Sequence, residues 1–133
     1  MDTQTYEKKR EELYTAHKSI MDASGKRLEE LHVEARTIEE SCEEISHFHQ
    51  TTKAMLNQCQ YELSYNDDKE DLNLFHQVGE SVHTNCTAKE YELAEMKEDV
   101  EKERKKIFND REDYEREYKR ALTKLDEEKK KNS

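Results

Sequence analysis

Apolar residues recur at steps of three and four along most of the chain, and this spacing constrains the fold more than any other feature. Residues spaced in this way lie on one face of an α-helix. A disordered chain has no reason to keep such a register, so the pattern predicts two long helices. The first series is Leu31, Ala35, Ile38, Cys42, Ile45, His49, Thr52, Leu56, Cys59 and Leu63. The second is Phe75, Val78, Val82, Cys86, Lys89, Leu93, Met96, Val100, Glu103, Ile107, Asp110, Tyr114, Tyr118, Ala121 and Leu125.

Composition excludes the main alternatives to a helical protein. The 133 residues include no Pro and two Gly, and only 32% are hydrophobic, against a usual ~45–50%. Sheets, Rossmann-like folds and P-loops need turn residues that this chain lacks. Upstream of Leu31 the apolar series is looser, and Gly25 predicts a kink or a loosened turn. Its members are Tyr6, Leu13 and Ile20, with the offset set Tyr14, Met21 and Leu28.

A cluster of turn residues at 64–68 separates the two series. We expect an all-α fold, a long antiparallel two-helix hairpin with a coiled-coil-like seam, forming one domain over 1–133. Helix one is expected at about 4–63, the turn at about 64–71 and helix two at about 72–129. Asp67 or Asp68, with Asp71 in the first turn, is expected to cap helix two.

A hairpin gives each helix a single neighbour, so its large apolar residues cannot all be buried in one seam. Partly exposed apolar residues are common, but the number here favours a helical partner that completes a four-helix bundle. This partner is a second copy or a different hairpin. The candidate partner-binding residues are Phe48, Met55, Phe75, Phe108, Tyr114 and Tyr118.

Sequence patterns give little support for catalysis or metal binding. Glu-x-x-His occurs at Glu29, Glu44 and Glu80, as in di-iron bundles, but chance supplies roughly one such pair and the excess is small. We therefore expect no metal and no cofactor, with a di-metal bundle as a remote alternative. Cys42 and Cys59 lie on the seam, where burial is the default. A hairpin offers no concave pocket for a nucleophile, so no catalytic residue is assigned.

Net charge and the N-terminal sequence narrow the partners and the location. A charge of −10 disfavours nucleic acid and anionic lipid. No apolar run approaches ~18 residues, and the chain opens without a hydrophobic segment of the signal-peptide type, so membrane insertion is not expected. The protein is expected to be cytoplasmic, or exported with its partner by a route that needs no signal peptide.

The stretch from Lys106 to Leu122, KIFNDREDYEREYKRAL, with the two-helix architecture, resembles the small α-helical proteins that accompany LXG-type toxins in Gram-positive type VII secretion. These are WXG-like hairpins, although this chain has no Trp and carries Asn-Asp-Asp at 66–68 in place of the W-x-G turn. The export signal of that pathway is an aromatic followed four residues later by an acid. Phe108 with Glu112 fits it, as does Tyr91 with Glu95.

The resemblance implies a targeting or chaperone role, in which the chain binds the helical N-terminal domain of an LXG-type toxin, with or without a second small helical protein. Glu112 joins the partner-binding residues on this ground. The competing class is a generic coiled-coil scaffold or a self-associating four-helix bundle. Polar seam positions such as His49, Lys89 and Glu103 favour one particular mate, because such layers fix register and partner choice.

Overall fold

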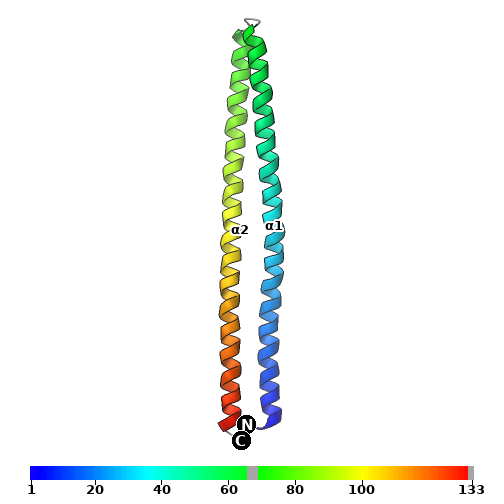
Figure 1. Ribbon diagram of the computed structural model, residues 1–133, viewed down its shortest axis with the longest axis vertical. Coiled ribbons are helices and arrows are strands. Elements are labelled where there is room, and N and C mark those ends of the chain that lie inside the picture. Colours follow the sequence, from blue (N-terminus) through cyan, green and yellow to red (C-terminus); the bar gives the residue numbers. More distant parts are fainter. Residues whose placement is uncertain (66–68, 132–133) are drawn as a thin grey trace. The chain divides into compact units, whose positions relative to one another are not determined.

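The computed structural model describes residues 1–65 and 69–131, and it confirms the expected all-α helical hairpin. Helix α1 spans Thr3–Tyr65 and helix α2 spans Lys69–Lys131 (Figure 1). The two helices are packed against each other, and the described residues contain no strand. The caps expected from Asp67 and Asp68 lie outside the described residues.

Local chemistry accounts for the helix ends. Asp2 caps α1, because its side chain accepts a hydrogen bond from the Thr5 backbone N–H at 2.7 Å. That bond lowers the pKa of the Asp2 carboxyl. Helix α2 has acidic residues in its first turn, including Asp71 as expected, and three lysines in its last turn. Both distributions complement the helix dipole.

The predicted turn is wrong at its edges, because both helices are longer than expected. Helix α1 continues through 64–65, where the Ser64 hydroxyl donates to the Tyr61 carbonyl at 2.7 Å. The Tyr61 and Tyr65 rings also meet edge to face with centroids 5.4 Å apart. Helix α2 begins at Lys69 and includes 69–71. Ser64 is therefore accommodated in the last turn of α1, where its hydroxyl bonds to the backbone of that turn.

The loosened turn expected at Gly25 is also absent, since α1 is α-helical through this residue. A Cβ atom built at Gly25 would lie 3.4 Å from the Arg111 guanidinium. The Nη1 atom of Arg111 donates to the Met21 carbonyl at 3.0 Å and to the Ser24 hydroxyl at 2.6 Å. Gly25 thus leaves room for an arginine from the other helix.

Packing divides the chain into two units, each with a segment of both helices. The central unit is residues 34–100, and the terminal unit is residues 1–33 and 101–133. In the central unit Leu56 lies beside Gly79, while Glu39 pairs with Lys97 at 3.3 Å. As residue numbers increase along α1, the numbers of their contact partners on α2 decrease, so the two helices of this unit are antiparallel. The single-domain assignment stays a prediction.

The α1 half of the central seam is confirmed, because every predicted member from Ala35 to Leu63 is buried or half-buried. The α2 half is wrong at three positions, since Val78, Lys89 and Met96 are exposed. Gly79 takes the interior place expected for Val78. A glycine carries no hydrophobic signal, so periodicity alone does not place Gly79 at the interface, where it faces Leu56. The buried residues of this unit are Ile38, Cys86, Leu93 and Val100.

The terminal unit contains more polar packing. Its buried apolar residues are Tyr6, Leu31 and Leu125. Of the loose upstream series, Tyr14 and Ile20 are exposed, as is the predicted seam residue Tyr114, so these assignments are wrong. The unpredicted His17 takes an interior position, where it stacks on Tyr118 with ring centroids 4.2 Å apart and planes 3° apart. His17 also meets Glu115 at 3.0 Å.

Two leucines of α2 in the central unit test this burial pattern. Leu93 is 4% exposed and Leu74 is 56% exposed. We expect Leu93→Ala to lower the free energy of unfolding by about 2–5 kcal/mol, since it deletes buried methyl groups. Leu74→Ala should change it by less than about 1 kcal/mol. Urea unfolding followed by circular dichroism measures both, and equal losses would contradict the assigned seam.

Candidate partner-binding surface

More large apolar residues lie on the surface than in the interior of the described chain. Seven apolar residues are buried, and thirteen large ones are exposed. The thirteen are Tyr14, Ile20, Val33, Phe48, Met55, Tyr61, Tyr65, Leu74, Val78, Tyr91, Met96, Phe108 and Tyr114. Single exposed apolar residues need no explanation, whereas aligned ones mark interaction sites.

The residues proposed from sequence to bind a partner fall into two groups. Phe48, Met55 and Phe108 are 54%, 59% and 51% exposed. Tyr114 and Glu112 are exposed as well. The remaining two are half-buried between the helices: Phe75 in the central unit and Tyr118 in the terminal unit.

The clearest alignment lies on one side of the central unit. Ser41, Phe48 and Met55 are seven residues apart and therefore share a side of α1. A groove of about 310 Å³ runs beside Phe48, between the two helices. Its lining residues are Ser41, Glu44, Ile45, Phe48, Lys89 and Leu93.

Helix α2 adds apolar residues to the same side. Lys89 lines the groove with Phe48. Val78 lies eleven residues before Lys89 and eighteen before Met96, and both separations complete nearly whole helical turns. The three residues therefore share one side of α2. The contact between Leu56 and Gly79 places Met55 and Val78 at one level. We call this surface the Phe48 face. Its members are Ser41, Ile45, Phe48 and Met55 of α1 with Val78, Lys89 and Met96 of α2.

A second groove, of about 490 Å³, lies in the terminal unit beside Phe108. Phe108 and Glu112 line it together with Met21 of α1, so the aromatic and the acid of the suggested export signal share one groove. Arg111, also in the lining, is anchored on α1 by its hydrogen bonds to Met21 and Ser24. Sequence reasoning missed Arg111, since nothing in its spacing distinguishes it from solvent-facing arginines.

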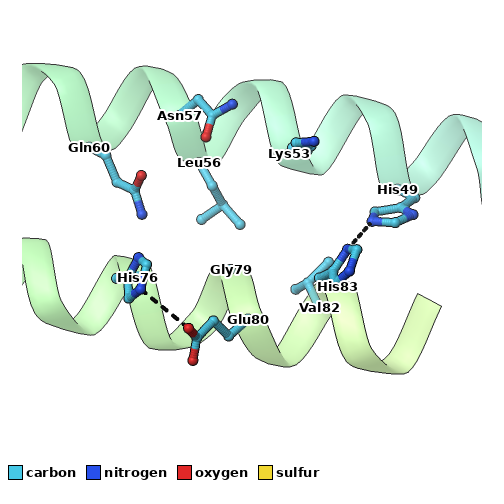
Figure 2. Close-up of a pocket in the computed structure, with 10 residues that line it drawn as sticks. All are labelled: His49, Lys53, Leu56, Asn57, Gln60, His76, Gly79, Glu80, Val82 and His83. Atoms are coloured by element: carbon cyan, nitrogen blue, oxygen red, sulfur yellow. Dashed lines mark hydrogen bonds and ion pairs between the residues drawn. The ribbon is translucent and has the colours of Figure 1, made fainter. Parts of the chain in front are cut away.

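A third groove, of about 260 Å³, contains a histidine pair that joins the helices of the central unit (Figure 2). The Nε2 atom of His49 lies 3.1 Å from Nδ1 of His83, and the Nδ1 atom of His49 lies 3.2 Å from a Glu90 carboxylate oxygen. This bond between rings requires one nitrogen to donate and the other to accept. His49 was expected as a polar seam layer, and it is one.

The three Glu-x-x-His pairs do not converge. Their six residues, at 29, 32, 44, 47, 80 and 83, are exposed, and no group of three or more metal-ligating side chains occurs in the described part of the chain. Cys86 is buried, while Cys42 and Cys59 are half-buried, and all three are free thiols. The grooves therefore present apolar and charged surface, without an assembled set of ligands or a reactive thiol.

One ion pair fixes the register of the terminal unit. The guanidinium of Arg27 donates from Nε and Nη2 to the two carboxylate oxygens of Glu103, at 2.8 and 2.9 Å. This two-bond geometry is the most directional that a side-chain ion pair offers. Arg27 lowers the pKa of Glu103 below its ordinary value through these bonds. Hydrogen bonding to Asp126 likewise raises the pKa of Tyr6.

We expect Arg27→Gln to raise the pKa of the Glu103 carboxyl toward its ordinary value, because the bonds that favour the charged form are lost. In the unaltered protein Glu103 contributes stability above its unfolded pKa, and this contribution is lost as pH falls through its folded pKa. Carboxyl carbon chemical shifts in an NMR titration measure the change, with Glu112 as the control. An unchanged Glu103 midpoint would contradict the pair.

Comparison of the chain with protein families, curated proteins and solved structures gives no match. No helix in the described residues is long and apolar enough to cross a membrane. The exposed apolar residues and the three grooves are therefore the observations from which a function is inferred.

Proposed function

We propose that this protein is a non-enzymatic helical adaptor, which binds a helical segment of another protein along the apolar residues that its own two helices leave exposed. The Phe48 face carries this proposal. It aligns four exposed large apolar residues along one side of the central unit, beside a groove between the helices. An amphipathic helix laid in such a groove buries both its own apolar stripe and the exposed one.

The nature of the grooves supports binding over catalysis. Those beside Phe48 and Phe108 are lined by an exposed phenylalanine, by charged side chains, and by aliphatic side chains that are buried or half-buried. A catalytic site excludes water around converging reactive groups. The one buried thiol, Cys86, lies in the helix–helix interior and is placed as a small apolar side chain.

We further propose that the partner is the helical N-terminal domain of an LXG-type toxin, which the adaptor would present for type VII secretion. The resemblance of the stretch from Lys106 to Leu122 supports this identity. The shared groove of Phe108 and Glu112 supports it too, because the two residues offer one composite surface to a partner. On this proposal the chain works in the cytoplasm, or leaves the cell with the toxin.

Co-expression with the toxin domain tests the proposal. We expect the two chains to co-purify. The combined substitutions Phe48→Ala, Met55→Ala and Phe108→Ala should weaken the complex about 10- to 100-fold, as loss of central apolar anchors does. Binding measured by titration calorimetry, with thermal unfolding of each variant, separates lost contacts from lost folding.

Tyr61→Ala is the matched control. Tyr61 is exposed on α1 of the central unit, about 140° around the helix from Phe48. This variant should bind as the unaltered chain does. Absence of co-purification, with the chain forming a stable bundle of its own copies, would overturn the adaptor proposal in favour of a self-associating scaffold.

A further inference from the structure

The charge of this protein is distributed very unevenly between its two units. Residues 34–100 contain 16 Asp and Glu against 5 Lys and Arg, a net charge of −11. Residues 1–33 and 101–133 contain 17 acidic and 18 basic residues, a net charge of +1. The whole negative charge of the chain is therefore carried by the central unit, which also carries the Phe48 face.

The central unit has too few cations to neutralise all of its carboxylates. Lys89 pairs with Glu92 at 3.4 Å, and Lys97 pairs with Glu39 at 3.3 Å. Even if each of the five cations neutralised one carboxylate, eleven would remain. This excess creates a negative potential around the unit, which attracts positively charged partners.

The excess reaches the Phe48 face itself. Glu44 lines the groove beside Phe48 and is exposed. The one cation in that groove, Lys89, is already paired with Glu92. An apolar strip edged by the exposed Glu44 carboxylate, on a unit with a net charge of −11, is complementary to a helix that has an apolar stripe flanked by Lys or Arg.

We propose that the Phe48 face docks a basic amphipathic helix. This inference rests on the proposed adaptor function and names the chemistry of the partner. Phe48 and Met55 lie seven residues apart, about 10.5 Å along α1, so the docked helix presents apolar residues at heptad spacing. Lys and Arg on the edges of that stripe face Glu44 and its neighbours. A second copy of the central unit is disfavoured as occupant, because it would set two charges of −11 against each other.

The full-length chain and a defined pair of peptides test this docking. The first peptide is a fluorescein-labelled helix of roughly 20 residues with Leu at heptad a and d positions and Lys elsewhere. The second replaces every Lys with Glu. Fluorescence anisotropy at about 150 mM salt should show binding of the Leu/Lys peptide, and at least about tenfold weaker binding of the Leu/Glu peptide.

Substitutions that keep the charge distinguish docking from simple attraction. The double substitution Phe48→Ser and Met55→Ser should weaken binding of the Leu/Lys peptide about tenfold or more, because apolar anchors are lost while the net charge is unchanged. Tyr61→Ser, which removes one exposed aromatic ring elsewhere on the central unit, should change the affinity less than about twofold. Glu44→Gln should weaken binding about two- to threefold, and this difference should shrink at high salt.

Equal binding by the unaltered chain and the Phe48/Met55 variant would overturn the inference, as would tighter binding of the Leu/Glu peptide. This failure is distinguishable from failure of the adaptor function. A toxin domain that co-purifies but depends on Phe108 alone leaves the adaptor role standing and refutes docking at the Phe48 face. Loss of toxin binding with the Phe48/Met55 variant, together with the peptide results above, supports both.

Discussion

The structure depends on the interface between α1 and α2, in which each helix packs against only one other helix. Each helix has a single neighbour, so the interior consists of thin layers and holds few buried apolar residues. Such an interface buries little apolar surface. Polar cross-links add to the specificity of its register. Arg27 meets Glu103 through two hydrogen bonds in the terminal unit, and His49 meets His83 in the central unit. Each polar link joins one level of α1 to one level of α2.

The same narrow interface leaves many large apolar residues exposed. Phe48, Met55 and their neighbours on the Phe48 face are not failures of packing, since a two-helix fold has no third element to cover them. Glycine has the opposite role within the interior. At Gly25 the absent side chain leaves room for Arg111, and Gly79 lies in the interior opposite Leu56. The interior is thus built partly from residues that contribute no hydrophobic surface of their own.

Sequence reasoning recovered the fold because helical periodicity accumulates over long segments, and the α1 seam from Ala35 to Leu63 was predicted without error. It failed in α2 where the strict spacing favoured Val78 over Gly79. It also missed His17, since an imidazole stacked on Tyr118 has no signature in one dimension. Of the residues predicted to bind a partner, Phe48, Met55 and Phe108 are exposed, whereas Tyr118 and Phe75 are half-buried because aromatic rings widen a seam. Which residue of α2 faces a given residue of α1 depends on how the two helices are aligned along their length. Hydrophobic periodicity within each helix does not determine that alignment.

The uneven distribution of charge between the two units bears on which kind of partner the exposed apolar residues would bind. Residues 34–100 carry the excess of carboxylates as well as the Phe48 face. Electrostatic repulsion therefore opposes the pairing of two copies through this exposed apolar surface. The central claim is that this surface serves a different chain. Sedimentation equilibrium of the protein alone, at tens of micromolar and at low and moderate salt, tests it most directly. We predict the mass of one chain throughout. A stable dimer or tetramer at low salt, where repulsion between like charges is strongest, would contradict the account.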